Sequence, residues 1–280
     1  MFTLNCRGKL LCLEEPVVMG IINTTPDSFF AGSRAKSVDD ILFAAEKKIN
    51  EGAAILDIGG QSTRPGSEQI TVGEELKRVM PAVEAIARNF PEQILSIDTF
   101  YSHVARAAVE AGADIVNDVS AGTIDNELIS TVASLGSPYV LMHMPGSPRT
   151  MQANAGYKNV TLEVFDFLNL KLEALTRAGI NDIIVDVGFG FGKTAAHNFQ
   201  LLRELSYFRQ LGRPLMVGLS RKATIYRTLG ISAEEALNGT TVMHTIALMN
   251  GAGILRVHDV KEARQAIRLF QAYKNEKEQL

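Results

Sequence analysis

The chain has 280 residues, of which 46% are hydrophobic and 21% charged, so it can bury the core of one large domain or two ordinary ones. Its formal net charge of −3 offers no basic field for nucleic acid, and no apolar run approaches the roughly 20 residues of a membrane span. We therefore expect a cytoplasmic protein that binds neither nucleic acid nor membrane.

The N-terminal stretch, residues 1–13, is predicted to form a β-hairpin. Two short apolar runs, 2–6 and 9–13, flank Arg7 and Gly8, which suit a two-residue turn. In that register Cys6 faces Lys9, and Cys12 faces Thr3. The two cysteines are not directly paired, so we expect no disulfide.

Eight further apolar runs are too short for helices and read as buried strands. Each run is followed by a polar residue, and these ends fall at or just before Asn23, Asp57, Asp98, Asn117, His143, Asp186, Ser220 and the Arg256/His258 pair. Helical patterns occupy most of the intervals, at residues 37–50, 71–88, 101–111, 125–135, 160–178, 196–205, 232–249 and 260–274.

Alternating strands and helices predict a parallel α/β sheet, and eight such units most economically close into a (β/α)8 TIM barrel. An open doubly wound sheet also fits the alternation, although its strand order would split the ring of polar ends. No linker or change of composition divides the chain, so we expect one domain over residues 1–280. In either architecture a ligand would bind at the carboxyl ends of the strands.

The loop at residues 24–33 contains Phe29 and Phe30 among polar residues and a glycine. This composition suits a mobile flap that covers a site, or equally a loop anchored by buried Phe29.

The glycine-rich segment 187–194 invites a nucleotide-binding interpretation. Only three residues separate Gly188 from the Gly192–Lys193 pair, whereas a P-loop needs four. A dinucleotide fingerprint does match from Gly190, but no acidic residue lies near position 215 to bind a ribose. We interpret the segment as a tight strand-to-helix turn that exposes Phe189 or Phe191.

Asp98, Asn117 and Asp186 stand at three equivalent strand ends. Carboxylates accept paired N–H donors, so together with an amide they suit the edge of a flat amino-pyrimidinone ring. Each residue alone could equally cap a helix or a turn. Three of them at equivalent positions favour a ligand.

Positive donors follow the last two strands, where barrel enzymes often bind phosphate. Arg256 and His258 are two residues apart and point to the same side of their strand, and Lys222 lies after the preceding strand. A solvated basic rim is the alternative. Asn23 offers one oxygen toward a Mg²⁺ ion held mainly by substrate phosphate and water.

With these motifs in place, the chain resembles the dihydropteroate synthase family of the folate pathway from Met19 to His258. The shared motifs are 20-GIINTTPDSF-29, 57-DIGGQSTRPG-66, 96-SIDT-99, 117-NDVS-120, Asp186 with 188-GFGFGK-193, 220-SRK-222 and 256-RVH-258. Each motif is weak alone, and together they are specific.

The resemblance implies a TIM barrel that binds two substrates, a dihydropterin diphosphate and p-aminobenzoate, with Mg²⁺. It implies that the pterin is bound by Asp98, Asn117, Asp186, Lys222 and Arg256, and the diphosphate by Asn23, Thr63, Arg256 and His258, with Asn23 on the metal. The aminobenzoate pocket would contain Phe29, Thr63, Arg64, Pro65, Phe191, Ser220 and Lys222. Catalytic roles would fall to Asp98, Asp186, Lys222 and Arg64, and a homodimer is implied, for which we expect contact through the late helices.

Four positions depart from the family pattern. Thr24 stands where valine is common and Val187 where proline is common, and neither change touches the chemistry. Ala31 replaces a common acidic residue in the first flap. Ala223 replaces a common serine near the aminobenzoate carboxylate, so that hydroxyl contact is absent, which bears on affinity and not on the reaction class.

A second function uses the same barrel, as a methyltetrahydrofolate-binding module or methyltransferase that serves a cobalamin protein. Such a protein has no use for a diphosphate site, so Arg64, Lys222 and the Arg256/His258 pair argue against it. A silent partner of an active synthase is a third possibility that residues alone leave open.

Overall fold

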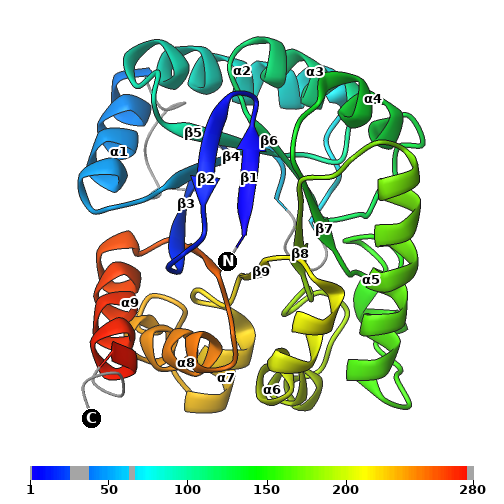
Figure 1. Cartoon of the computed structure of the whole chain (residues 1–280), viewed down its shortest axis with the longest axis vertical. Coiled ribbons are helices and arrows are strands. Elements are labelled where there is room, and N and C mark those ends of the chain that lie inside the picture. Colours follow the sequence, from blue (N-terminus) through cyan, green and yellow to red (C-terminus); the bar gives the residue numbers. More distant parts are fainter. Residues whose placement is uncertain (1, 26–37, 63–66, 276–280) are drawn as a thin grey trace.

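The computed structural model describes residues 2–25, 38–62 and 67–275. In these residues eight parallel strands close into a barrel in the order β10-β3-β4-β5-β6-β7-β8-β9, preceded by a separate antiparallel pair (Figure 1). The strands are β1 (Thr3–Cys6), β2 (Lys9–Cys12), β3 (Val17–Asn23), β4 (Ile55–Gly59), β5 (Ile94–Asp98), β6 (Ile115–Asp118), β7 (Tyr139–Met142), β8 (Ile183–Asp186), β9 (Leu215–Val217) and β10 (Ile254–Val257). The TIM barrel with an N-terminal hairpin is confirmed, and the pairing of β10 with β3 excludes an open sheet.

Helices surround the barrel, as Figure 1 shows. They are α1 (Val38–Asn50), α2 (Val72–Asn89), α3 (Ser102–Glu110), α4 (Leu128–Leu135), α5 (Val160–Arg177), α6 (Ala195–Arg203), α7 (Ala223–Leu229), α8 (Leu237–Met249) and α9 (Val260–Asn275), with short 3-10 helices η1 (Met151–Asn154) and η2 (Leu205–Leu211). Within the described ranges, no helix is both long enough and apolar enough to cross a membrane.

Two helix starts lie later than the sequence pattern indicated, because side chains bind the backbone there. Asp125 accepts hydrogen bonds from the amides of Ser102 and Glu127, so α4 begins at Leu128 and not at 125. The prediction of one helix over 232–249 was also wrong in extent, since α8 begins at Leu237. The short helices α7, η1 and η2 were not predicted.

The hairpin closes one end of the barrel. Its register pairs Cys6 with Lys9 and Thr3 with Cys12, as predicted, and both cysteines are free. The turn residues Arg7 and Gly8 have φ values of 54° and 101°, as a two-residue hairpin turn of the primed type requires. The buried hairpin side chains pack into one cluster with the inward residues at the amino ends of the strands, among them Met19 and Ile55.

Alternation along the strands determines which side chains enter the barrel. On β4, Ile55 belongs to the inner cluster, whereas Leu56 packs outward with the helices. Successive strand residues point to opposite faces, so Asp57 points inward again. The same counting sends Ser96, Asp98, Asn117, Asp186 and Arg256 into the barrel. The amino end of the barrel is therefore apolar and closed, and its carboxyl end is lined with polar groups.

Candidate active site

Arg256 brings three strands together at the polar end of the barrel. Its Nε lies 2.6 Å from Asp57 Oδ2, and its Nη2 lies 2.6 Å from Asp98 Oδ2. Asn117 Nδ2 also donates to Asp57 Oδ2, at 3.1 Å. Three of the predicted pterin-binding residues, Asp98, Asn117 and Arg256, thus converge on one point.

The sequence interpretation assigned no site role to Asp57, the residue that joins this group. Asp57 is fully buried, and its Oδ1 has no hydrogen-bond partner among the described residues. The available signal was its inward position on β4, two residues beyond Ile55. That signal shows where the carboxylate points but not which side chains meet it.

Asp186 and Lys222 form the opposite side of the same opening. Asp186 Oδ1 accepts the Gly188 amide at 2.7 Å, and Lys222 Nζ donates to the Phe189 carbonyl at 2.5 Å. Burial lowers the pKa of Lys222 to about 8, with the charge of Asp186 acting in the opposite direction. Burial also raises the pKa of Asp98 to about 7, opposed by Arg256. Charged groups with few solvent contacts are therefore concentrated in this mouth.

The glycine-rich segment after β8 is a tight turn held from within by Lys193. Lys193 is buried, and its Nζ lies 2.9 Å from the Gly188 carbonyl, 3.0 Å from the Phe191 carbonyl and 3.0 Å from His143 Nδ1. Its ammonium is directed into the protein, so it does not act as a P-loop lysine. Of the two candidate aromatics, Phe189 is buried, and Phe191 is partly exposed with Lys222 Nζ 4.7 Å from its ring centroid.

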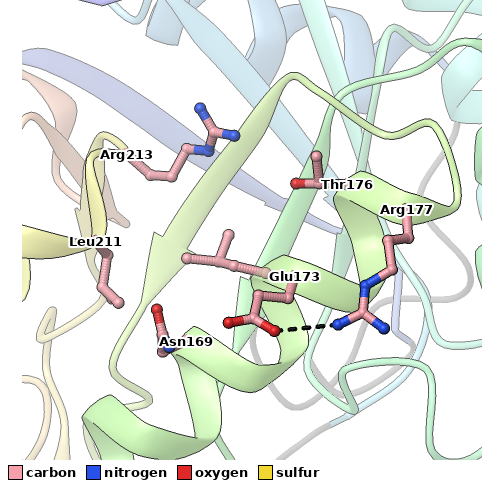
Figure 2. A pocket seen from close by; sticks show the side chains of 7 residues that line it. Asn169, Glu173, Thr176, Arg177, Leu211 and Arg213 are labelled. Carbon is pink, nitrogen blue, oxygen red and sulfur yellow. Dashed lines mark hydrogen bonds and ion pairs between the residues drawn. The ribbon is translucent and has the colours of Figure 1, made fainter.

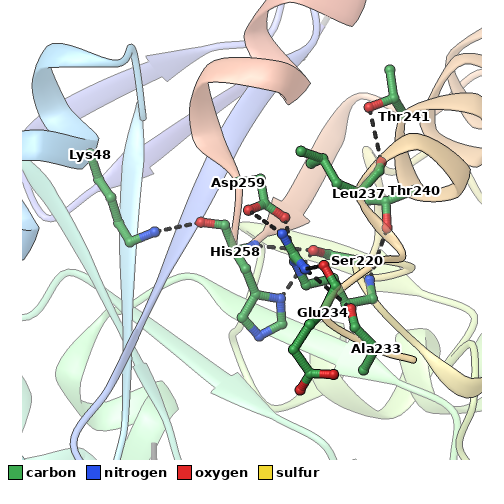
Figure 3. A network of polar contacts seen from close by, with 10 residues as sticks. Lys48, Ser220, Ala233, Glu234, Leu237, Thr240, Thr241, His258 and Asp259 are labelled. Atoms are coloured by element: carbon green, nitrogen blue, oxygen red, sulfur yellow. Dashed lines mark hydrogen bonds and ion pairs between the residues drawn. The ribbon is translucent and has the colours of Figure 1, made fainter. Parts of the chain in front are cut away.

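Ser220 and His258 meet at the rim beside these groups, with 3.0 Å between Oγ and Nδ1. Arg221, which has a φ of 53°, holds this rim by binding Asp259 through two nitrogens, at 2.8 and 3.0 Å. Figure 3 shows Ser220, His258 and Asp259 in this network. Arg221 also donates to the carbonyls of Ala233 and Glu234, ahead of α8. These carbonyls accept from a side chain, which explains why the helical pattern at 232–236 does not become part of α8.

The remaining predicted residues divide into two groups. Asn23 ends β3 and pairs in register with Gly59 of β4, so it lies at the same end of the barrel. Phe29, Thr63, Arg64 and Pro65 lie outside the described residues, as does most of the 24–33 loop.

Glu75 of α2 is a buried acid that the sequence did not single out. Its side chain is fully buried, and within the described ranges neither carboxylate oxygen has a hydrogen-bond partner. It packs beneath Gly60, where a Cβ would lie 3.3 Å from Glu75 Cγ. Burial raises the pKa of Glu75 from 4.5 to about 7, and the charge of Asp98 adds to the shift.

This pKa predicts a measurable pH dependence of stability. Between pH 4.5 and about 7 the folded protein retains a proton on Glu75 that the unfolded chain has lost, so the contribution of Glu75 to stability falls as pH rises through this window. Glu75→Gln should remove this pH dependence. Between pH 4.5 and 8, the free energy of unfolding of the variant should therefore fall by about 2–3 kcal/mol less than that of the wild type. Urea denaturation at several pH values measures it. The exposed α2 substitution Glu84→Gln should retain the wild-type slope, and an unchanged slope in Glu75→Gln would contradict the prediction.

A surface hollow between α5 and η2 contains none of these residues. Figure 2 shows its lining, in which Glu173 pairs with Arg177 at 3.1 Å near Leu211 and Arg213. These residues precede the amino ends of β8 and β9, away from the polar mouth. The mouth, where titratable groups converge, is therefore the candidate active site.

The chain matches one family model and is similar to several known proteins. The family model described as "Pterin binding enzyme" matches residues 19–258. The chain is 43% identical over 274 residues to the dihydropteroate synthase of Haemophilus influenzae, covering 97% of this chain and 99% of that protein. It is similar to the structure of Xanthomonas albilineans dihydropteroate synthase with 4-aminobenzoic acid, at 42% identity and a TM-score of 0.91, covering 97% of this chain and 98% of that one. It is also similar to the structure of the Xanthomonas albilineans enzyme in complex with 7,8-dihydropteroate, at 39% identity and a TM-score of 0.87, covering 98% and 99% of the two chains.

Proposed function

The chain belongs to the family of pterin binding enzymes, and on that premise we propose that it is a dihydropteroate synthase. This transferase condenses (7,8-dihydropterin-6-yl)methyl diphosphate with p-aminobenzoate to give 7,8-dihydropteroate and diphosphate, in tetrahydrofolate biosynthesis. The observation that carries the proposal is 43% identity over nearly the whole chain to a dihydropteroate synthase, together with the acids and cations that meet in the barrel mouth.

We assign the pterin edge to Asp98, Asn117 and Asp186. Two carboxylates and an amide oxygen accept the N–H groups of an amino-pyrimidinone ring, and the buried setting strengthens each bond. Lys222 would donate to the carbonyl side of the ring, and the guanidinium of Arg256 would lie against its face.

The diphosphate would lie toward Arg256, His258 and Asn23, with Thr63 from the second flap. The described residues contain no cluster of three His, Cys, Asp or Glu side chains suited to a metal, so they supply no cage of their own. Asn23 fits as a single neutral oxygen ligand to Mg²⁺ that the diphosphate itself largely coordinates. The bound ion would neutralise charge on the leaving diphosphate.

Loss of diphosphate breaks the C–O bond at the pterin methylene and leaves a cationic pterin. Asp98 and Asp186 stabilise that cation, and Arg256 and His258 stabilise the departing anion. The arylamine nitrogen then forms the new C–N bond and releases a proton. Phe191, Ser220 and Lys222 would position p-aminobenzoate with Phe29, Thr63, Arg64 and Pro65, so orientation and electrostatics supply most of the rate.

The direct test supplies purified protein with Mg²⁺, the pterin diphosphate and p-aminobenzoate. We expect dihydropteroate, with diphosphate released slowly when p-aminobenzoate is absent. Absence of product with both substrates, combined with tighter binding of methyltetrahydrofolate than of the pterin diphosphate, would favour the methyltransferase-type module. Absence of product without such binding would favour a silent partner.

Asp186→Asn tests the pterin edge. The asparagine oxygen can still accept the Gly188 amide, so the turn should persist while the charge is lost. We expect calorimetry to show pterin binding weaker by about 1.5–3 kcal/mol, because a charge-assisted hydrogen bond becomes a neutral one. The exposed α5 substitution Asp166→Asn is the control. Unchanged affinity in Asp186→Asn would show that Asp186 serves only the turn.

We also propose a homodimer, formed through the exposed apolar face of α8 and α9, which pack against each other. On α8, Val242, Ile246 and Met249 are 52%, 38% and 62% exposed at helical spacing, and on α9, Leu269 and Tyr273 are 73% and 58% exposed. Such a face suits burial against a second copy. Ile246→Glu should therefore shift the mass in light scattering to that of the monomer, whereas Phe43→Glu on α1 should not. A monomeric wild type would contradict the proposal.

We place the enzyme in the cytoplasm. The two free cysteines, Cys6 and Cys12, suit a reducing compartment.

A further inference from the structure

Arg256 is shared by two carboxylates that lie at different depths in the barrel. Asp98 pairs in register with Gly59, two residues beyond Asp57 on β4, so along the strands it lies nearer the mouth than Asp57. Asp57 is fully buried, whereas the Asp98 side chain is 11% exposed. The deep carboxylate is closed off from solvent, and the shallow one faces the space where a ligand enters.

The two carboxylates also hold the guanidinium differently. Asp57 Oδ2 lies 2.6 Å from both Nε and Nη2 of Arg256, and it accepts a further hydrogen bond from Asn117. Asp98 contacts Nη2 alone, at 2.6 Å. Loss of the Asp57 contacts would leave the fully buried Asp57 carboxylate without its counter-ion. Loss of the Asp98 contact would only leave a carboxylate unpaired at the mouth.

Charge at this point is unbalanced, since one guanidinium faces two acids. Burial raises the pKa of Asp98 to about 7 even with Arg256 beside it, and Asp57 adds to that shift. An incoming diphosphate would compete with Asp98 for Nη2 of Arg256. N–H donors on a ligand ring would then replace the hydrogen bond that Asp98 loses.

We propose that Asp57 is the positioning residue that anchors Arg256, and that Asp98 is the partner Arg256 releases when an anion enters the mouth. The inference rests on the proposed function, in which the diphosphate and the pterin ring are parts of one substrate. Release of Asp98 makes its carboxylate available to the ring, so binding of the anionic half prepares the site for the other half. By donating Nδ2 to Asp57, Asn117 is turned so that its Oδ1 can accept from the ligand.

The first experiment measures inorganic diphosphate binding by calorimetry, with p-aminobenzoate absent. Asp57→Asn should weaken diphosphate binding at least about 10-fold, because Arg256 loses its charged anchor. Asp98→Asn should tighten it roughly 3- to 10-fold, because the competing carboxylate has gone. Asp114→Asn, at the closed end of β6, is the control for a lost carboxylate and should bind diphosphate as the wild type does.

The second experiment uses the wild type alone and does not depend on how the variants fold. Inorganic diphosphate should tighten the binding of 6-hydroxymethyl-7,8-dihydropterin, and the pterin should tighten the binding of diphosphate by the same factor. Weaker diphosphate binding in Asp98→Asn, unchanged binding in Asp57→Asn, or no coupling in the wild type would each overturn the proposal. None of these readouts requires turnover, so failure of the synthase assay would be seen separately.

Discussion

Replacing Arg256 with methionine is expected to abolish turnover and to lower the free energy of unfolding by about 3–5 kcal/mol. The substitution leaves Asp57, which is fully buried, beside Asp98 with no cation between them. It also removes the cation that would stabilise the departing diphosphate, which we expect to lower kcat at least about 100-fold. Urea denaturation and a steady-state assay with both substrates measure the two effects.

The stability loss in Arg256→Met should shrink in acid. Burial already raises the pKa of Asp98, and loss of the guanidinium that opposes this shift should raise it further, so Asp98 retains its proton in the folded protein at a pH where the unfolded chain has lost it. The variant should therefore regain stability relative to the wild type as pH falls. Arg203→Met is the control, since Arg203 is 74% exposed in its ion pair with Glu204 and should cost no more than about 1 kcal/mol. A loss below about 1 kcal/mol in Arg256→Met, with turnover retained, would contradict this account.

Gly188→Ala is expected to disrupt the turn that carries Phe189, Phe191 and Lys193. A Cβ at position 188 would lie 1.9 Å from the His143 carbonyl oxygen and 3.2 Å from Lys193 Nζ, and the φ of 73° is in the left-handed region. Backbone atoms cannot rotate away as a flexible side chain can, so we expect a loss of about 3 kcal/mol or more. Displacement of the Phe189 carbonyl should also release Lys222 and impair turnover.

Gly136→Ala separates the steric clash from the left-handed backbone conformation, the two causes of the stability loss expected in Gly188→Ala. Gly136 ends α4 with a φ of 60°, yet a Cβ there meets nothing within 4 Å. This control should cost about 1 kcal/mol, the conformational part alone, with activity unchanged. Equal losses of stability in the two variants would show that the clash with His143 is not the cause.

Much of the fold could be predicted because it depends on local pattern. Short apolar runs alternating with helical segments require a parallel sheet with crossovers, and eight of them suffice to close a barrel. Arg7 and Gly8 between two short runs gave the hairpin and its register. Helix boundaries were less predictable where a distant group binds the backbone, as the Arg221 guanidinium does at Ala233 and Glu234.

The residues of the candidate site also separate into those that local pattern predicts and those that it does not. Asp98, Asn117 and Asp186 follow directly from the order of residues, because each stands at the carboxyl end of a strand and the carboxyl ends of parallel strands meet at one end of the barrel. Counting along the strands then shows that all three point inward. By the same counting Asp118 points outward, where it accepts the Tyr139 hydroxyl at 2.6 Å. The residues of the two flaps came from the resemblance to the family, and Phe29, Thr63, Arg64 and Pro65 remain predictions.

The sequence by itself determined the barrel, the hairpin and the end of the barrel at which polar groups gather, since each follows from the order of apolar and polar residues along the chain. Only the tertiary structure decided that Asp57 bonds to Arg256, 199 positions away, and that Glu75 is buried with no hydrogen-bond partner in the part of the chain that the structure describes. The reason is physical: barrel closure brings β10 beside β3 and within reach of β4, and no local pattern encodes which charges then face each other or how little water reaches them.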